Sequence, residues 1–282
     1  MPLANVKRTY ILTIIKLREM MKKQLVLPFW ALVCASGLFG ACSKTESGSV
    51  GTAKVDLRLT DAPGAFEALY LDVQGVEFHT NEAGWVTVDS VVPGLYNVLK
   101  LRNGVDTLLA RSELPAGTLS QVRLILGEDN SLVVDGEEHT LTVPSGQESG
   151  LKFNVHQELL PNGSYTVWTD FDAARSIVQT GNGSYQLKPV IRVFTEQTNG
   201  RIKGIIEPMS ANPVIYAISD ADTASAIPDA DGFFLISGLQ ETDYTVIVEP
   251  DSISGLETDT IADVPVRFGI ISDLGTITLT TP

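Results

Sequence analysis

Apolar and polar residues alternate with a period of two from residue 53 onward. In the first such stretch the odd positions 53–59 are Ala, Val, Leu and Leu, and the even positions 54–60 are polar. Successive side chains of a β-strand point to opposite faces, so this pattern predicts a strand with one buried row and one row in water. The composition of Asp61-Ala62-Pro63-Gly64 predicts a turn at the end of this strand. The alternation resumes at 69–73 and shifts by one position at 76–78, which predicts a β-bulge at Gln74-Gly75.

Further alternating runs follow, separated by Gly, Asn and Pro clusters. They predict strands at 85–88, 95–101, 119–126, 131–134, 140–143, 151–155, 165–171 and 185–194. Asp135-Gly136 predicts a two-residue hairpin. Only 105–111 and 172–178 have helical character, and both are expected to be short connectors. Regularly spaced strands with turn signals predict a sandwich instead of alternating strand and helix units.

A second unit with the same pattern begins near Gly200. Its predicted strands are at 201–206, 214–217, 233–236 and 244–248. The linker 195–199 is short and has no Pro or Gly run, so we expect the two units to pack against each other. The predicted fold class is therefore all-β, with two antiparallel β-sandwich domains over 53–195 and 200–282 and short connecting helices only.

The first 41 residues have the three parts of an export signal. A basic start at 21–23 is followed by an apolar run at 25–38 and by the small pair Gly40-Ala41. The apolar run is shorter than the ~20 residues that a membrane-spanning helix needs, and Pro28 interrupts it. We therefore predict a signal peptide over 1–41, with the true start at Met20 or Met21, and a flexible tether over 42–52.

The five residues 38–42, Leu-Phe-Gly-Ala-Cys, resemble a bacterial lipobox. The resemblance implies that the Cys42 thiol is diacylglycerated, that the signal is removed before it and that the new amino terminus is acylated, for example with palmitate. More than one acyl chain gives stable anchoring at ~0.8 kcal/mol per buried methylene. Since Ser43 is not the Asp that retains some lipoproteins at the inner membrane, we expect the outer membrane of a Gram-negative bacterium, on its periplasmic or outer face.

The charge balance excludes nucleic acid as a partner. The chain has 20 Lys and Arg against 34 Asp and Glu, and six of the basic residues but only Glu19 of the acidic ones lie within 1–41. The remaining residues therefore carry a formal charge of about −19 by subtraction. Phosphate binding needs clustered Lys and Arg, which this composition lacks.

Cysteine usage removes several other classes of site. Cys34 lies in the predicted signal, and Cys42 is the predicted lipid attachment point. No disulfide is then possible in the mature protein, and thiolate zinc sites and cysteine nucleophiles are excluded. Residues 42–282 are enough for one large or two modest domains held by their cores alone.

The chain contains no nucleophile elbow, zinc-protease motif, P-loop or dinucleotide-binding glycine motif. His79, His139 and His156 have no second ligand at metal spacing and are interpreted as surface or edge residues. We predict no catalytic residue, metal or cofactor, and hence no enzyme.

Asp170 and Asp172 are the best candidates for acid-base chemistry. Two residues apart on a strand, they face the same side about 7 Å apart, a separation that fits work on a glycoside. The alternative is that Asp172 caps a helix beginning at Ala173, which we favour.

Two other groups of residues invite a functional interpretation. The loop residues Asp220, Asp222, Asp229 and Asp231 suggest calcium, but an EF-hand register would place Ser225 where glycine is needed, so a solvated acidic loop is preferred. Four aromatic residues would suit a sugar platform but are expected to pack in a core, namely Trp85, Trp168, Tyr165 and Tyr185.

Asp followed by Ser or Thr and then by a small or aliphatic residue occurs five times, more than ordinary usage gives. The pattern is similar to the acceptor motif of a bacterial O-glycosylation system, with the alternative that Asp and Thr are turn residues before strands. The candidate acceptor positions are Ser90, Thr107, Thr223, Ser252 and Thr260.

Two family resemblances follow from longer motifs. Residues 51–195 resemble an uncharacterised family of exported bacterial lipoproteins, domain of unknown function family 4382, through 59–64, 117–127, 170–174 and 187–193. Residues 200–280 resemble the carboxypeptidase regulatory-like, transthyretin-type β-sandwich through 231–234, 238–239 and 244–246, with Thr242 in place of the usual glycine. The second resemblance implies a structural or partner-binding module, with carbohydrate binding in some relatives.

The favoured function is a non-enzymatic, lipid-anchored envelope protein used for binding, adhesion or assembly, with a membrane, a protein or a glycan as partner. One alternative is carbohydrate binding by the carboxyl-terminal domain, dependent on Tyr216 or Tyr244. The other is a cryptic hydrolase built on Asp170 and Asp172.

Overall fold

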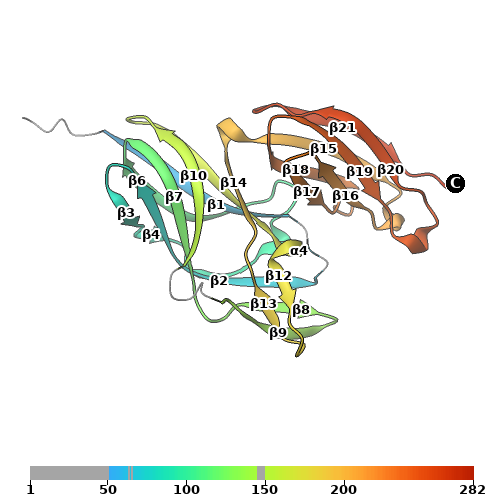
Figure 1. Cartoon of the computed structure of the whole chain (residues 1–282), viewed down its shortest axis with the longest axis horizontal. Helices are drawn as coiled ribbons and strands as arrows, with labels where there is room; N and C mark the ends of the chain where they lie inside the picture. Colours follow the sequence, from blue (N-terminus) through green and yellow to red (C-terminus); the bar gives the residue numbers. More distant parts are fainter. Residues whose placement is uncertain (1–50, 63, 65, 145–149) are drawn as a thin grey trace, which may run out of the picture. The chain divides into compact units, whose positions relative to one another are not determined.

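The computed structural model describes residues 51–62, 64, 66–144 and 150–282 (Figure 1). The predictions for the signal peptide over 1–41 and for lipid attachment at Cys42 lie outside these residues. The described residues belong to one compact unit. They are almost entirely β-structure, so the predicted fold class is confirmed.

Most of the strands precede residue 196. They are β1 (Thr52–Ala62), β2 (Ala68–Thr80), β3 (Gly84–Thr87), β4 (Ser90–Val91), β5 (Gly94–Asn97), β6 (Thr107–Pro115), β7 (Gly117–Leu126), β8 (Ser131–Val134), β9 (Glu137–Thr142), β10 (Leu151–Leu159), β11 (Ser164–Asp172), β12 (Ile177–Gln179), β13 (Tyr185–Leu187) and β14 (Ile191–Thr195).

The later strands are β15 (Gly200–Glu207), β16 (Val214–Ile218), β17 (Thr223–Ala226), β18 (Phe233–Leu239), β19 (Asp243–Glu249), β20 (Asp259–Pro265) and β21 (Ile271–Thr278). Among the described residues, the helical elements are the single turn α4 (Ala173–Ser176) and the 3-10 turns η1 (Val98–Lys100), η2 (Glu196–Thr198), η3 (Met209–Ala211) and η4 (Ser252–Ser254).

Two sheets contribute to the larger hydrophobic core. One has the strand order β14-β11-β1-β6-β4, and the other runs β10-β7-β2-β8-β9-β13-β12, with β3 and β5 also paired to β2. The odd positions 53–59 of β1 are at most 1% exposed, which confirms the predicted buried row. These side chains form one cluster with apolar residues of β2, β6, β7 and β11.

Strand β1 has a partner on each side. It pairs antiparallel with β6 and parallel with β11. Parallel pairing also joins β9 to β13 and β15 to β21, whereas the other pairings are antiparallel. Parallel partners need a long crossover between them, and more than 100 residues separate the start of β1 from that of β11. Such distant pairings leave no local pattern in the sequence.

The predicted bulge and hairpin are both present. The pairing of β2 with β7 changes register between Val73 and Gly75. A side chain at Gly75 would lie 3.2 Å from Ile125, so the bulge also allows close packing there. The hairpin between β8 and β9 turns at Asp135 and Gly136, whose φ angles are 51° and 76°, as a two-residue hairpin requires.

The helical character predicted for 105–111 is wrong. Residues 107–115 form β6, in which Leu109, Ala110 and Leu114 are fully buried. Pairing with β1 and burial of these side chains override the local preference. The strand predicted at 185–194 is divided into β13 and β14, with Pro189 between them. Proline has no N–H to donate to a sheet, which explains the interruption.

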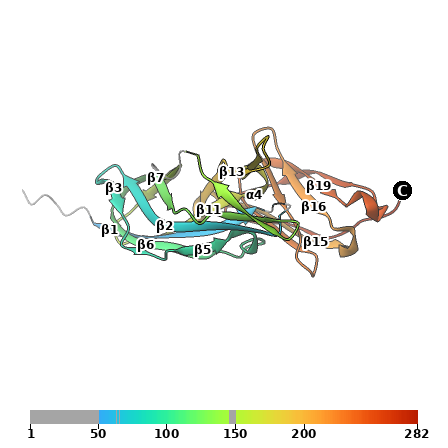
Figure 2. The same cartoon turned by 90° about the horizontal axis from the view of Figure 1, so that it is seen from below.

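A second pair of sheets encloses the smaller core (Figures 1 and 2). Their strand orders are β18-β15-β21 and β17-β16-β19-β20. The core draws its apolar side chains from residues 202–279 and shares none with the larger core. The domain limits 53–195 and 200–282 remain predictions, but each predicted range contains its own pair of sheets.

Tyr244 of β19 is 1% exposed and joins the smaller core to a neighbouring loop. Its hydroxyl accepts a hydrogen bond from the backbone N–H of Gln240 at 3.0 Å and donates one to Asp222 Oδ2 at 3.2 Å. A tyrosine that bonds to backbone a few residues upstream is a recurrent corner of β-sandwiches. The ring fills the core while the hydroxyl holds the loop.

We expect Tyr244→Phe to lower the free energy of unfolding by about 1 kcal/mol, because it removes these two hydrogen bonds and leaves the ring in place. Urea denaturation measures the change. Tyr216→Phe is the matched control, since Tyr216 is half-buried on the neighbouring strand and its hydroxyl has no hydrogen-bond partner among the described residues. Equal losses for the two variants would contradict the role of the Tyr244 hydroxyl.

Candidate functional site

The predicted carboxylate pair lies at the end of β11, where α4 begins. Asp172 Oδ1 accepts a hydrogen bond from the backbone N–H of Arg175 at 2.9 Å, and Oδ2 accepts one from Arg175 Nε at 2.6 Å. Asp172 is the N-cap of α4, so the favoured interpretation of this residue is confirmed.

Asp170 is bound by Arg192 of β14. Its Oδ2 accepts hydrogen bonds from Arg192 Nε at 3.0 Å and from Nη2. Burial raises the pKa of the Asp170 carboxyl, and the Arg192 guanidinium opposes that rise. Each carboxylate of the predicted pair is thus held by an arginine of the same chain. This arrangement fits a structural role and gives no support to acid-base catalysis.

A third carboxyl group, Asp61 at the end of β1, lies beside this pair. Asp61 is 6% exposed, and neither side-chain oxygen has a hydrogen-bond partner among the described residues. Burial, with the charges of Asp170 and Asp172, raises its pKa well above the usual value. The Ala173 backbone N–H and Arg102 oppose the rise, but the Ala173 amide does not reach hydrogen-bonding geometry. Asp61 therefore carries its proton at pH values where an exposed aspartate is ionised.

The sequence pattern indicates that Asp61 is buried. The interpretation of this residue as part of a turn did not use that indication. The buried row of β1 occupies the odd positions 53–59, and the next odd position is Asp61. Strand β1 continues to Ala62 and does not end at Thr60. An acidic residue in register with a buried row is a sign of a buried, functional or strained carboxyl group.

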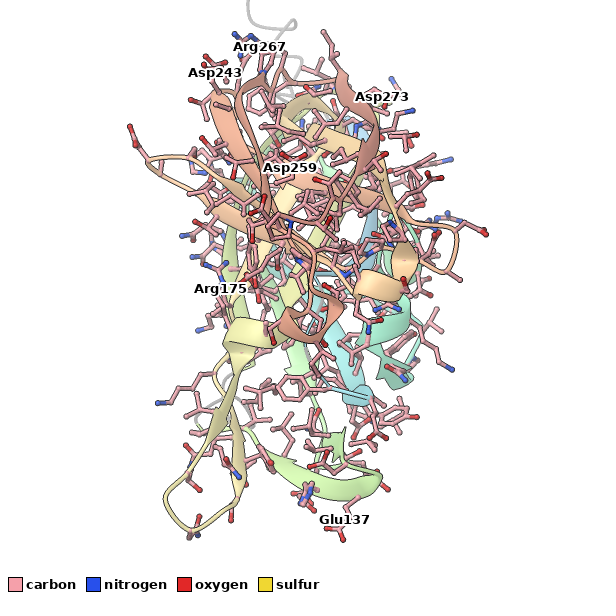
Figure 3. The ribbon with its side chains drawn as sticks, turned by 90° about the vertical axis from the view of Figure 1, so that its right-hand side faces the viewer. Glu137, Arg175, Asp243, Asp259, Arg267 and Asp273 are labelled. Carbon is pink, nitrogen blue, oxygen red and sulfur yellow. The ribbon has the colours of Figure 1, made fainter. Side chains whose placement is uncertain are left out.

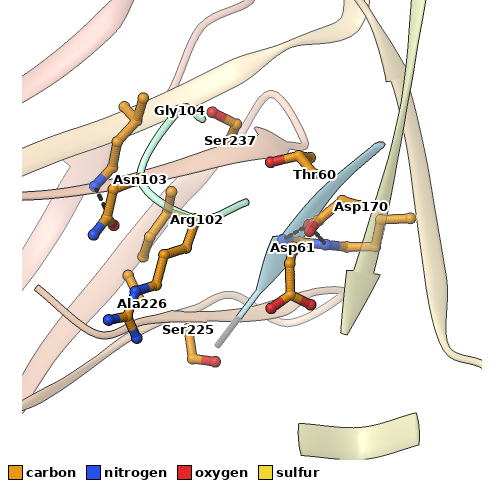
Figure 4. A pocket seen from close by; sticks show the side chains of 12 residues that line it. Thr60, Asp61, Arg102, Asn103, Gly104, Asp170, Ser225, Ala226 and Ser237 are labelled. Atoms are coloured by element: carbon orange, nitrogen blue, oxygen red, sulfur yellow. Dashed lines mark hydrogen bonds and ion pairs between the residues drawn. The ribbon is translucent and has the colours of Figure 1, made fainter. Parts of the chain in front are cut away.

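Asp61 opens into a small polar pocket, here called the junction pocket. Thr60, Asp61, Asp170 and Arg192 line it from the strands around the larger core, and Ser225 and Ser237 line it from β17 and β18. Figure 4 shows Asp61 and Asp170 on one side of this pocket and Arg102 and Asn103 on the other. Its volume is about 20 Å³, enough for about one water molecule.

Asn103 ties the two sets of sheets together at this point. Its Nδ2 donates a hydrogen bond to the Ile227 carbonyl at 3.0 Å, and its Oδ1 accepts one from the Leu235 N–H at 3.3 Å. Asn103 has a φ of 56°, a left-handed conformation that asparagine tolerates. Nearby, Arg192 Nη1 lies 4.0 Å from Asp222 Oδ2. The two hydrogen bonds of Asn103 thus join the walls of the junction pocket, whereas the contact between Arg192 and Asp222 is too long for a hydrogen bond.

A larger crevice of about 140 Å³ adjoins the junction pocket and shares Thr60, Gly104, Leu235 and Ser237 with it. We call it the aromatic crevice, and its other lining residues are Asp106, Trp168, Phe194, Glu196, Asn199 and Arg201. The rings of Trp168 and Phe194 are stacked, with centroids 5.6 Å apart and planes 11° apart. Trp168 Nε1 donates to Asp106 Oδ2 at 2.7 Å, and Arg58 binds the other oxygen of Asp106.

A groove of about 630 Å³ lies on the second pair of sheets, between the loops 219–222 and 240–243. Asp220, Glu241, Asp243 and Asp263 line it. Arg267 lies 3.7 Å from Asp243, and Figure 3 shows the two side chains next to each other. The groove is acidic, in keeping with the composition of the whole chain.

Two of the four acidic loop residues have structural partners. Asp222 accepts a hydrogen bond from Tyr244, and Asp229 Oδ1 accepts hydrogen bonds from the backbone N–H groups of Asp231 and Phe233 at 3.0 Å each. Within the part of the chain that the structure describes, no group of three or more His, Cys, Asp or Glu side chains is placed to hold a metal ion. The calcium interpretation therefore gains no support.

The predicted histidine and aromatic positions are distributed over the first pair of sheets. His79 Nδ1 is 2.7 Å from Ser120 Oγ, His139 packs against the Tyr185 ring, and His156 is exposed. The prediction that the four aromatic residues lie in a core is wrong for Trp85, which is 36% exposed with Arg123 Cζ 4.1 Å from its ring centre.

Tyr165 and Tyr185 are half-buried and pack against the larger core. Trp168 is also half-buried but lines the aromatic crevice.

Four of the five candidate glycosylation residues are exposed. Thr107 is half-buried, and the exposed ones are Ser90, Thr223, Ser252 and Thr260. The aspartates that precede Thr107 and Thr223 take part in the internal hydrogen bonds described above. Modification at these positions remains a prediction.

One family model matches the first part of the chain. Residues 52–189 match the model of the family described as "Domain of unknown function (DUF4382)". The predicted resemblance over 51–195 is confirmed over this range, whereas the carboxypeptidase regulatory-like resemblance of 200–280 remains a prediction. No curated protein matches the chain.

Several solved structures are similar over 82% of this chain at low identity. They include the Bacillus anthracis TIE protein (9% identity, 34% of that chain, TM-score 0.22), the shaft pilin SpaA from Lactobacillus rhamnosus GG (7%, 98%, 0.22) and BcpA, the major pilin subunit of Bacillus cereus (10%, 100%, 0.21). The chain thus matches about a third of the length of the first of these proteins. TM-scores this low carry no argument about fold or function. Among the described residues, no helix is long and apolar enough to cross a bilayer.

The raised pKa of Asp61 predicts a pH-dependent difference between the wild type and Asp61→Asn. The folded state keeps the Asp61 proton between the unfolded pKa of about 3.9 and the higher folded pKa, so the wild type loses stability as pH rises through this window. The amide cannot ionise. We expect the stability advantage of Asp61→Asn to grow through this window by up to about 1.4 kcal/mol per pH unit and then to level off.

Urea denaturation of both proteins from mildly acidic to mildly alkaline pH tests this expectation. Asp231→Asn, on an exposed turn, is the control for the loss of a carboxyl group elsewhere in the chain. A difference between the wild type and Asp61→Asn that stays constant with pH would contradict the raised pKa of Asp61.

Proposed function

We propose that this protein is a non-enzymatic, lipid-anchored protein of the cell envelope that serves as a binding, adhesion or assembly module. The proposal rests on one observation, that Arg192 donates a hydrogen bond to Asp170 and Arg175 donates one to Asp172. This pair was the best candidate for acid-base chemistry in the sequence, and both members hold structure together. The all-β fold offers broad sheet faces and loops of the kind on which binding surfaces are built.

The lipid anchor rests on the sequence. The lipobox-like residues 38–42 follow a basic and an apolar segment, and the proposed attachment point is Cys42. The tether 42–52 would separate the membrane from β1, where the described fold begins. We place the protein at the outer membrane of a Gram-negative bacterium, with a sandwich over 53–195 and a carboxypeptidase regulatory-like domain over 200–282.

The alternative of carbohydrate binding by the carboxyl-terminal domain needs a different residue from Tyr244. That ring is 1% exposed and its hydroxyl is already bonded, so it has no face for a sugar. Tyr216 is half-buried. A sugar-binding role finds better support at the junction pocket and aromatic crevice than on either tyrosine.

Cys42→Ser should abolish lipid attachment, because only a thiol receives the diacylglyceryl group. In cells fed labelled palmitate, we expect the wild type to be labelled and recovered with membranes, and the variant to be unlabelled. Cys34→Ser is the matched control, since Cys34 lies within the predicted signal, and its label should persist. Label that persists in Cys42→Ser would contradict the anchor, and protease treatment of intact cells would separate the outer from the periplasmic face.

The proposed O-glycosylation predicts extra mass on the protein from its native host. The intact mass should exceed that of the lipidated polypeptide, and Thr223→Ala with Ser252→Ala should remove part of the excess, because both residues are exposed. A mass equal to polypeptide plus lipid would contradict the modification.

A further inference from the structure

Unpartnered buried polar atoms are concentrated at one place in the described structure. Across all the described residues, six buried side-chain nitrogen or oxygen atoms have no hydrogen-bond partner, and they belong to Asp61, Asn97, Arg123, Arg192 and Arg201. Four of the six are both oxygens of Asp61, Nη1 of Arg192 and Nε of Arg201. Asp61 and Arg192 line the junction pocket, and Arg201 lines the adjoining aromatic crevice.

Such a concentration calls for a physical explanation. Each buried polar group without a partner costs about 1–3 kcal/mol, and native proteins contain few of them. Asp61 is more than nine-tenths buried and lines the junction pocket with both oxygens free. A guest that enters the pocket and crevice would supply the missing partners.

We propose that the junction pocket and the aromatic crevice together form a binding site for a single sugar residue or a similar neutral polyol. The inference deepens the proposed role as a binding module and names the chemical class of its ligand. It does not depend on the lipid anchor, which has its own test.

The mixture of unpartnered atoms points to hydroxyl groups. Asp61 offers oxygens, whereas Arg192 and Arg201 offer N–H donors. A hydroxyl group both donates and accepts, so one polyol satisfies both kinds of partner. Asp170 is already neutralised by Arg192.

The charges in the crevice are matched in the same way. Asp106 is neutralised by Arg58, and Glu196 and Arg201 are the remaining charged lining residues, of opposite sign. The formal charges that line the crevice therefore sum to zero, which favours a neutral ligand there, whereas the junction pocket also contains Arg102, which has no ion-pair partner among the described residues.

The aromatic wall of the crevice is the second feature, beside the unpartnered polar atoms, that would recognise a sugar. Trp168 is stacked on Phe194 and its ring is held in place by the hydrogen bond from Nε1 to Asp106. Small-molecule sites combine apolar, often aromatic walls with a few polar groups that fix orientation. A sugar ring presents C–H groups on one side and hydroxyl groups at its edge, and so fits an aromatic wall beside a polar pocket.

The size of the space limits the guest. The aromatic crevice has about 140 Å³ and the junction pocket about 20 Å³. On this scale about 10–15 Å³ holds one water, so the junction pocket admits about one water molecule and the crevice several. That is room for one sugar ring, with the rest of any longer glycan outside.

Trp168 provides a direct reporter of binding. The sequence has three tryptophans, Trp30 in the predicted signal, Trp85 and Trp168. In the mature, detergent-purified full chain carrying Trp85→Phe, fluorescence comes from Trp168 alone. Titration with glucose, galactose, N-acetylglucosamine and glycerol should give a saturable change with at least one of them, whereas glycine and acetate should give none.

Variants assign the response to the site. Asp61→Ala and Arg201→Gln should each weaken the response at least tenfold, about 1.4 kcal/mol. Arg111→Gln is the matched control because Arg111 is exposed, pairs with Asp56 and lines neither cavity. Urea denaturation of each variant separates loss of binding from loss of folding, and Arg201→Gln stands as an independent variant if Asp61→Ala does not fold.

Three results would overturn the proposal. The first is no response to any polyol up to about 100 mM, with a crystal structure that shows only ordered water in the cavities. The second is unchanged affinity in folded Arg201→Gln and Asp61→Ala. The third is binding of glycine or acetate in preference to sugars. Each leaves the palmitate-labelling test unaffected, so failure of this inference is distinguishable from failure of the proposed function.

Discussion

A carboxyl group carried into the interior of a protein either finds a cationic partner or gives up its charge. Both solutions occur side by side in this structure. Asp170 is bound by Arg192, whereas Asp61 has no hydrogen-bond partner among the described residues and burial raises its pKa well above the usual value. The two residues lie near the ends of the parallel strands β1 and β11, where Thr60 is the register partner of Asp170. The need to pair or neutralise these carboxyl groups therefore determines which polar groups lie where the junction pocket meets the aromatic crevice.

The same region connects the two sets of sheets. Asn103 bonds to Ile227 and Leu235 across the junction, and Arg192 lies within reach of Asp222 as well as of Asp170. These bonds hold the cavity walls in place without closing the space between them. A site preorganised in this way loses little conformational entropy when it takes up a guest. The same few side chains therefore join the two sets of sheets and line the proposed binding site.

The proposed role at the membrane agrees with the way the fold is stabilised. Both cysteines of the sequence lie outside the described residues, so the two cores and their hydrogen-bonded sheets hold the described fold together without a disulfide. Most acidic side chains of the described residues are exposed, which favours solubility and disfavours contact with anionic lipid. A covalent lipid at Cys42 would supply the membrane attachment that such a surface does not.

Alternation of side chains along the sequence determined much of the fold. It predicted the buried row of β1, the bulge at Gln74-Gly75 and the hairpin at Asp135-Gly136, because each depends on neighbours within a few residues. The N-cap role of Asp172 was equally local. The strand at 107–115 was missed because its pairing with β1, about 50 residues away, outweighs local preference.

The candidate site depended on tertiary structure almost completely. The sequence placed an acidic residue at 61 in register with a buried row, but it contained no information on what would face that residue. Arg192, Arg201 and Trp168 come from three different strands, and only the pairing of distant strands brings them around common cavities. The local pattern determined which faces are buried, because it follows from the two-residue repeat of a strand. The assembly of the sheets alone decided which polar atoms remain without partners, because that depends on contacts between residues far apart in the chain.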